Sequence, residues 1–283
     1  MIGTLQCQLF KHQNTFTQTE KIMTPSSVIN DPFNTQELEQ RVKAMYREVA
    51  LHPEVTYHFE MGSALAERLG YPSEILNQIP GEAIDSFAGV GYYFDLAQLK
   101  AGDVVVDLGS GSGMDAFYAA TQVGLQGKVI GLDMTLAQLD KANQLKQRHH
   151  FTQVDFLESY IETPPIVSRS IDTVISNGVI NLSSRKAQVF QEVARILKTG
   201  GRLVLSDIVS TSRLPESISC NVSLWAACIG GAIPETEYLA LIEAAGLKII
   251  QVKENPYQFL SEGAKGATAT YGIKSISVLA VKE

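Results

Sequence analysis

One short stretch constrains the fold of this chain more than any other. Residues 104–108 read VVVDL and residues 109–113 read GSGSG, followed by the alanine-rich run MDAFYAA at residues 114–120. β-Branched residues bounded by glycines predict a short buried strand, and the alanine-rich run predicts a helix that begins at the glycines. Glycines let the backbone approach a ligand closely, and the free N–H groups of a first helical turn favour a carboxylate or a phosphate. The stretch therefore predicts a cofactor cradle.

The spacing of the glycines indicates which cofactor the cradle holds. A nicotinamide oxidoreductase would need G-x-G-x-x-G, but Met114 stands where the third glycine should be. That alternative is therefore disfavoured. The string from Asp107 to Gly113 resembles the first motif of S-adenosylmethionine-dependent methyltransferases of the Rossmann-like class, with Asp107 as the motif's first acidic residue.

A second acidic residue supports the same cofactor. Residues 128–134 read KVIGLDM and predict a strand that ends at Asp133, 20 places after Gly113. A carboxylate at that offset can accept both ribose hydroxyls of an adenosine. Glu162 either accepts from the adenine amine or is a solvated loop carboxylate. The residues predicted to bind S-adenosylmethionine are Asp107, Gly109, Ser110, Gly111, Gly113, Asp133, Met134, Ile161, Glu162 and Asn177.

The rest of the pattern predicts the fold class. Strands and helices alternate, which favours an α/β fold with a doubly wound, Rossmann-like, mostly parallel sheet and an antiparallel final strand. Thr135 and Gln138 fit a capping box at the start of the second core helix, and Gly200-Gly201 should stop the helix that begins at Lys186. The expected strands are 104–108, 128–133, 154–158, 171–177, 202–209, 247–252 and 275–281, and the expected core helices are 114–120, 135–147, 186–198 and 235–245.

Three regions are expected along the chain. Residues 1–30 show no sustained period and predict a flexible tail, and residues 31–95 predict an N-terminal helical cap. Residues 96–283 form the predicted cofactor-binding domain, with a helical insertion at about 211–233. The cap either packs against that domain or forms a lid over the pocket of the methyl acceptor.

Charge and composition exclude several classes of partner. The net charge of -7 and the pI near 5.3 match a polyanion poorly, so no nucleic-acid partner is expected. The sequence holds no apolar run near 18 residues, so we expect no membrane partner and a cytoplasmic protein. Cys7, Cys220 and Cys228 lack C-x-x-C spacing, which argues against a disulfide framework and against a metal site.

Two further strings point to a narrower family. Residues 174–182 (VISNGVINL) and 224–232 (LWAACIGGA) resemble the arsenite methyltransferase family, and the similarity in motif order covers roughly residues 76–250. In that family trivalent arsenic is held by cysteine thiolates, one in the glycine loop before the first core strand and one in each string. This chain has Val90 and Gly178 at the first two places and Cys228 at the third.

The loss of two thiols changes the expected substrate. Arsenic is a soft centre that needs thiolate ligands, which valine and glycine do not supply. We therefore expect S-adenosylmethionine-dependent methyl transfer to another small-molecule acceptor, with an arsenite or organoarsenical methyltransferase and a non-catalytic S-adenosylmethionine-binding module as alternatives. Cys228 is either a catalytic candidate or a small packing residue. The acceptor side is predicted from Tyr57, His58, Tyr92, Tyr93, Trp225 and Cys228, of which Cys228, His58, Tyr92 and Tyr93 are the catalytic candidates.

Overall fold

Residues 33–283 form one compact unit in the structure, which is a computed structural model. The predicted tail at residues 1–30 lies outside the described residues, and so do residues 216–217, 219–224 and 226–227 of the predicted helical insertion. The structure describes residues 35–57, 59–215, 218, 225, 228–259 and 262–283.

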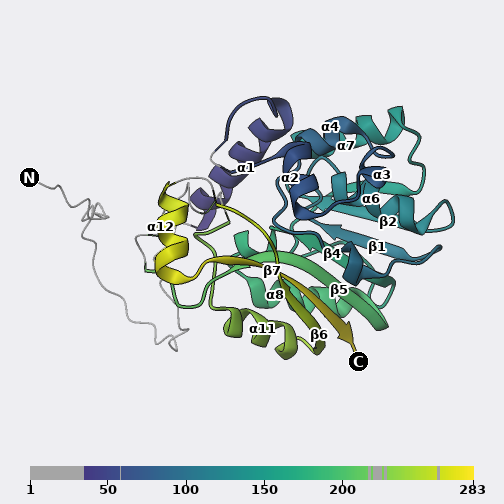
Figure 1. The fold of residues 1–283 in the computed structure, drawn as a ribbon. Helices are drawn as coiled ribbons and strands as arrows, with labels where there is room; N and C mark the ends of the chain where they lie inside the picture. Colours follow the sequence, from purple (N-terminus) through teal and green to yellow (C-terminus); the bar gives the residue numbers. More distant parts are fainter. Residues whose placement is uncertain (1–34, 58, 216–217, 219–224, 226–227, 260–261) are drawn as a thin grey trace, which may run out of the picture. The chain divides into compact units, whose positions relative to one another are not determined.

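A seven-stranded sheet forms the centre of this unit, in the order β3-β2-β1-β4-β5-β7-β6 (Figure 1). The pairs among β1 to β5 are parallel, and β7 runs antiparallel to both β5 and β6. The predicted fold class is therefore confirmed, including the antiparallel final strand. The strands are β1 Val104–Leu108, β2 Lys128–Asp133, β3 Val154–Glu158, β4 Ile171–Asn177, β5 Leu197–Val209, β6 Leu247–Glu254 and β7 Lys274–Lys282.

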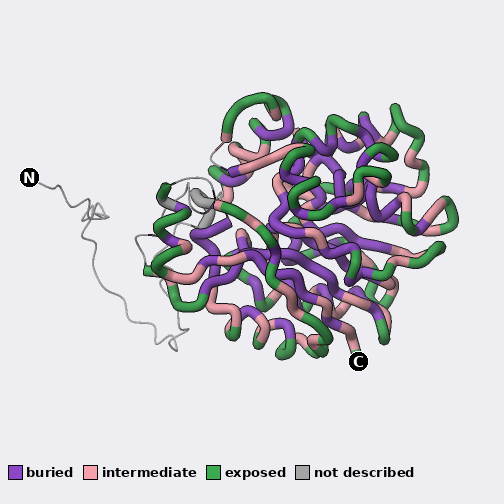
Figure 2. Tube along the Cα trace, viewed as in Figure 1, coloured by how far each residue is buried: buried purple, intermediate pink, exposed green. Residues whose placement is uncertain are grey.

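Helices cover both faces of the sheet (Figure 1). Along β1 the side chains alternate: Val105 packs in a cluster with α6 and α7, whereas Val106 and Leu108 pack in a cluster with α8 and α11. Figure 2 shows the resulting run of buried backbone through the central strands. The helices are α1 Thr35–Leu51, α2 Gly62–Leu69, α3 Ser73–Leu76, α4 Gly81–Asp85, α5 Phe94–Ala97, α6 Met114–Val123, α7 Leu136–Arg148, the 3₁₀ helix η1 Ile180–Leu182, α8 Lys186–Ile196, α11 Glu235–Ala244 and α12 Glu262–Tyr271.

The strand register aligns the carboxyl ends of the central strands. Leu108 of β1 stands beside Leu132 of β2 and Ser176 of β4. The next residues, Gly109, Asp133 and Asn177, therefore come to one edge of the sheet. Open α/β sheets bind their ligands at this edge.

The boundary between α8 and β5 differs from the prediction. The helix ends at Ile196 and the strand already begins at Leu197, where the sequence predicted helix to Lys198 and strand from Arg202. Leu197 is fully buried and pairs with Ile171, so sheet pairing of an apolar side chain outweighs the stop signal of Gly200-Gly201.

The predicted capping box at α7 is wrong, although the helix begins where expected. Thr135 is the N-cap residue but makes no side-chain capping bond. The Gln138 side chain instead accepts from Ser112 Oγ and donates to the carbonyl of Tyr46 in α1. The Gln138 side chain thus bonds to Ser112 and Tyr46 and not to the backbone at the start of its own helix.

The sequence pattern also missed α12 and the short helices α3, α4 and α5. Helix α12 contains Gly266 and two threonines, which are poor helix formers. It is held by packing of Ala264 and Ala267 in the cluster around Cys228. Among the described residues, no helix combines the length and the apolar character that crossing a bilayer requires.

Candidate functional site

The glycine loop after β1 has the backbone that its sequence predicts. Gly109, Gly111 and Gly113 all have positive φ, at 72°, 52° and 96°, a region that disfavours other residues. A side chain at Gly109 would strike Val179 and one at Gly113 would strike Phe117 and Phe156. At Gly111 the nearest atom to an added Cβ is Gln138 Oε1, 3.7 Å away. Gly111 is therefore the glycine whose backbone a ligand can approach.

Asp133 lies directly against this loop. Its Oδ2 accepts the Gly111 N–H at 2.9 Å, and its Oδ1 accepts the Thr135 N–H at 2.8 Å. Burial raises the pKa of the carboxyl, which these backbone bonds oppose. Each carboxylate oxygen has a second lone-pair site, so Asp133 can still accept from two hydroxyl groups.

Two buried polar atoms at the loop lack a partner among the described residues. They are Asp107 Oδ2 and Ser110 Oγ, in side chains that are 2% and 8% exposed. Burial, together with the neighbouring carboxyls of Asp115 and Asp133, raises the pKa of Asp107 well above its usual range. Buried polar atoms are rarely left unpaired, so this part of the loop fits a ligand that brings hydrogen-bond donors.

The residues predicted along the adenine lie after β2 and β3. Met134 is half-buried and Ile161 is buried. Apolar side chains with this degree of burial can cover the faces of an aromatic ring. Glu162 is 8% exposed and its Oε1 accepts from Ser183 Oγ at 2.5 Å, so the alternative of a solvated loop carboxylate is wrong. The adenine contact of Glu162 stays a prediction.

Asn177 lies where the sequence placed it, at the carboxyl end of β4, but its side chain is already bonded. Its Oδ1 accepts the Val90 N–H at 2.8 Å, and its Nδ2 lies 3.0 Å from both Gly91 O and Asp115 Oδ2. A contact of Asn177 with the methionyl ammonium stays a prediction, and it would have to use the second lone pair of Oδ1.

The three positions that resemble the family's arsenic ligands come together in space. A Cβ added to Gly178 would lie 3.3 Å from a methyl group of Val90 and 3.8 Å from Cys228 Sγ. Cys228 is buried with positive φ, and its thiol donates to the Gly178 carbonyl at 3.1 Å. Burial raises the pKa of this thiol far above its usual range, with Asp207 adding to the shift. The three positions are therefore close together in this chain, but only Cys228 supplies a thiol.

Most of the predicted acceptor side is not brought to Cys228. Tyr93 is fully buried and donates to Asp115 at 2.7 Å, and Tyr92 bonds to Tyr118 in the same cluster on the α6 face. Both hydroxyls therefore bond on the α6 side, and a role of Tyr92 and Tyr93 in the acceptor pocket stays a prediction. Tyr57 donates to the carbonyl of His52. His58 lies outside the described residues.

Two other tyrosines, which sequence reasoning missed, lie beside Cys228. The Tyr46 side chain of α1 interacts with the Cys228 thiol, and Tyr257 packs in the same cluster as that thiol. Burial raises the pKa of both phenols, so both stay protonated at neutral pH. Their sequence positions, far before and far after the core motifs, gave no signal for this contact.

A second buried polar group holds the segment that carries Cys228. Asp207 of β5 accepts the Tyr238 hydroxyl and the Asn181 N–H, both at 2.8 Å. The Asn181 side chain in turn donates to the carbonyl of Cys228. Trp225 is buried nearby, with its ring 5.8 Å from Lys186 Nζ. The backbone around Cys228 is thus tied to the central sheet.

Comparison with known proteins agrees with this geometry. The methyltransferase domain family matches residues 99–255, which is more than half of the chain. The arsenite methyltransferase of Halobacterium salinarum is 33% identical over 199 residues, covering 70% of this chain and 51% of that protein. The human arsenite methyltransferase is 40% identical over 151 residues, covering 50% and 40%. The chain thus spans about half or less of the curated relatives that it matches.

Solved structures match the same fold. An arsenic(III) S-adenosylmethionine methyltransferase from Chlamydomonas reinhardtii superposes with a TM-score of 0.60 at 29% identity, covering 79% of this chain and 75% of that one. A geranyl diphosphate C-methyltransferase from Streptomyces coelicolor has a TM-score of 0.64 at 16% identity, covering 89% and 99%, and shows the fold alone. The predicted resemblance to arsenite methyltransferases is confirmed, and the chain belongs to the methyltransferase domain family.

Proposed function

We propose that this S-adenosylmethionine-dependent methyltransferase transfers a methyl group to a small organic acceptor that is not held by three thiolates. The observation that carries the proposal is the cluster of Val90, Gly178 and Cys228. These three residues lie together at the positions that resemble the arsenic ligands of the arsenite methyltransferase family. Only Cys228 offers a soft ligand there, whereas trivalent arsenic needs several.

The glycine loop fits the methionyl part of the cofactor. The open backbone at Gly111 and the unpartnered Asp107 Oδ2 and Ser110 Oγ would face the ammonium and carboxylate groups, and Asp133 would accept from the ribose. Met134 and Ile161 would cover the faces of the adenine, and Glu162 its edge.

The bound cofactor supplies an electrophilic methyl group on a sulfonium. Displacement at that carbon needs the acceptor's nucleophile in line with the departing sulfur, so the protein contributes mainly placement and exclusion of water. Helix α1 supports water exclusion, because Tyr46 reaches Cys228 while its carbonyl accepts from Gln138 beside the glycine loop. Part of the predicted cap would then act as the lid.

The acceptor side is apolar with a few neutral polar groups. Val90, Ile208 and Cys228 lie in one buried cluster, and the hydroxyls of Tyr46 and Tyr257 come near the thiol. These groups are uncharged at neutral pH, since burial raises the pKa of each. Such a site favours a small, uncharged and partly apolar acceptor.

The test is a screen of small organic acceptors with the purified protein and S-adenosylmethionine, read out as S-adenosylhomocysteine. Wild type should form this product with at least one acceptor, and Asp133→Ala should lose most of the activity. Binding of S-adenosylmethionine without product from any acceptor would favour the alternative of a non-catalytic module. Turnover only with organoarsenicals would favour a lone-thiol arsenical methyltransferase instead.

A further inference from the structure

Asp115 is a buried carboxylate that the cofactor and acceptor assignments do not use. It lies in the first turn of α6, two residues after Gly113, and is 5% exposed. It accepts from the hydroxyls of Tyr71 and Tyr93, each at 2.7 Å, and from Asn177 Nδ2 at 3.0 Å. Three donors from separate parts of the chain therefore meet on one carboxylate directly behind the glycine loop.

Asn177 extends this junction to the loop of residues 89–91. Its Oδ1 accepts the Val90 N–H and its Nδ2 donates to the Gly91 carbonyl, as a neighbouring strand would. A side chain at Gly89 would lie 2.7 Å from Asn177 Nδ2, so the close approach depends on glycine. The Asp115 carboxylate orients the amide by accepting from the same Nδ2 group.

The opposite side of the loop is fixed by a chain of buried polar side chains from the far end of the sequence. Ser275 Oγ donates to the Val90 carbonyl at 2.6 Å and accepts from Asn255 Nδ2 at 2.9 Å. Ser277 Oγ in turn donates to Asn255 Oδ1 at 2.9 Å. With both backbone groups of residue 90 bonded, the direction of its Cα–Cβ bond is fixed.

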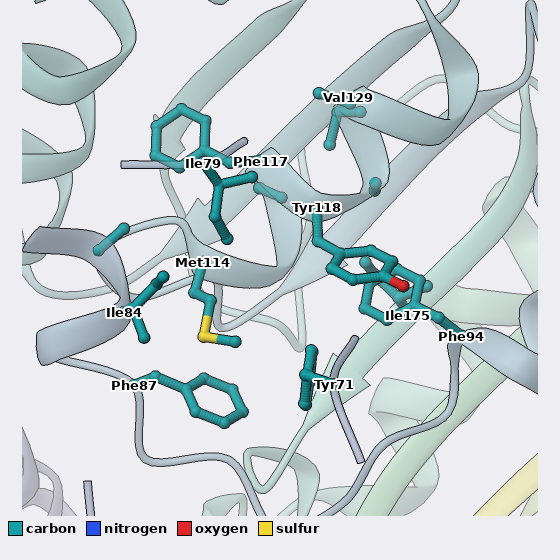
Figure 3. Packing of buried hydrophobic residues seen from close by; sticks show 14 of the residues in the cluster. Tyr71, Ile79, Ile84, Phe87, Phe94, Met114, Phe117, Tyr118, Val129 and Ile175 are labelled. Carbon is teal, nitrogen blue, oxygen red and sulfur yellow. The ribbon is translucent and has the colours of Figure 1, made fainter. Parts of the chain in front are cut away.

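That orientation places Val90 against the acceptor side. Its methyl groups lie 3.3 Å and 3.6 Å from where a Cβ at Gly178 would be, and it packs in the cluster of Cys228. Figure 3 shows the other side of the junction, where the side chains of Tyr71, Phe87 and Met114 lie close together. A continuous path of bonds thus runs from the start of α6 through Asp115 and Asn177 to Val90.

From this path we propose that Asp115 is a positioning residue for methyl transfer. Through Asn177, its carboxylate holds the loop of residues 89–91, which carries Val90, against the glycine loop that would bind the methyl donor. The proposal rests on the proposed function, because the benefit of fixing one loop on the other lies in the alignment of donor and acceptor. Small errors in such alignment lower the rate of a displacement without preventing either ligand from binding.

The test compares two tyrosine variants that each lose one buried hydroxyl in the same packing cluster. Tyr93→Phe removes a bond to Asp115, whereas the control Tyr118→Phe removes the bond between Tyr118 and Tyr92 and leaves Asp115 bonded as before. Tyr71→Phe is a second variant, which removes the other phenol from Asp115 and also its contact with Asn177 Nδ2. Thermal unfolding identifies variants that are merely destabilised.

Two readouts separate positioning from a structural role. Hydrogen exchange of the peptide that contains Val90 should be about tenfold faster in Tyr93→Phe and Tyr71→Phe, the effect of losing one charge-assisted bond, and unchanged in Tyr118→Phe. With the acceptor found by the screen, kcat should fall by about tenfold or more in the same two variants. The Kd for S-adenosylhomocysteine and the KM for the acceptor should stay within about threefold of wild type.

The outcomes of this test are distinct. Equal hydrogen exchange and equal kcat in Tyr93→Phe, Tyr71→Phe and Tyr118→Phe would overturn the inference. Weaker cofactor binding or a lower Tm that accounts for the whole fall in rate would overturn it as well. If wild type forms no product with any acceptor, the proposed function fails. Unchanged exchange at Val90 in Tyr93→Phe and Tyr71→Phe would overturn the junction itself.

Discussion

A double substitution, Val90→Cys with Gly178→Cys, should convert this acceptor site into one that captures arsenite. The new side chains would stand at the two positions whose thiols this chain lacks, and a Cβ at residue 178 lies 3.8 Å from Cys228 Sγ. Three thiols and arsenous acid form three As–S bonds in place of three As–O bonds, with release of three water molecules and no change of oxidation state. Thiolates are the ligands that a soft centre prefers.

The cost to stability can be worked from the same geometry. Gly178 has a φ of 71°, so a cysteine there costs about 1–2 kcal/mol of backbone strain. Val90→Cys costs about 1 kcal/mol, because it makes a buried side chain smaller. It leaves one sulfur in place of the two methyl groups that lie 3.3 Å and 3.6 Å from a Cβ at residue 178. The sum, about 2–3 kcal/mol, is within what a domain with 5–15 kcal/mol of stability tolerates.

The assay measures arsenic bound per protein molecule and methylated arsenic formed from S-adenosylmethionine with excess thiol. Capture should be strongest in the double variant and weaker in each single variant, because each added thiol binds intramolecularly at a high effective concentration. The matched control is Val90→Ser with Gly178→Ser, which has the same shape without sulfur. A folded double variant that binds no more arsenite than this control would refute the convergence of the three positions.

Three further predictions follow from the site. Asp133→Ala should weaken S-adenosylmethionine binding by about 2–3 kcal/mol in calorimetry, whereas Asp140→Ala on the exposed face of α7 should not change it. Burial raises the pKa of Asp207 to about 6, above its unfolded value of about 4, so its contribution to stability is present below pH 4 and is lost as the pH rises through 6. Relative to Asp207→Asn, wild type should therefore lose about 2–3 kcal/mol of unfolding free energy between pH 4 and pH 7 in denaturant titrations, and a pH-independent difference would contradict the buried charge. The buried thiol of Cys228, with its raised pKa, should resist iodoacetamide at pH 8 until the protein unfolds, as measured by mass spectrometry of its peptide.

The parts of the fold that local pattern determines were predictable. Strands β3 and β4 have the predicted bounds, because short runs of apolar residues between polar loops have few other arrangements. The glycine loop and Asp133 also lie together as predicted, since parallel strands in a doubly wound sheet bring their carboxyl ends to one edge. Helix α12 was missed because contacts with distant residues hold it, and its own sequence favours helix weakly.

The acceptor side was less predictable, because it depends on which way aromatic side chains point. Tyr92 and Tyr93 are adjacent to the Gly89-Val90-Gly91 loop in sequence, yet both pack toward α6, where Asp115 and Tyr118 bond their hydroxyls. Tyr46 comes from α1, more than 180 residues before Cys228 in the chain. Asp115 could have been suspected, because it follows the glycine loop directly in the first turn of a helix.

The central claim is that this site transfers a methyl group and does so to an organic acceptor instead of arsenite. The most direct test supplies wild type with labelled S-adenosylmethionine, excess thiol, arsenite and the best acceptor from the screen in one reaction. Label should appear on the organic acceptor, with an equal amount of S-adenosylhomocysteine and almost none on arsenic. Robust methylation of arsenic that disappears in Cys228→Ser would contradict the claim and assign this site to arsenite.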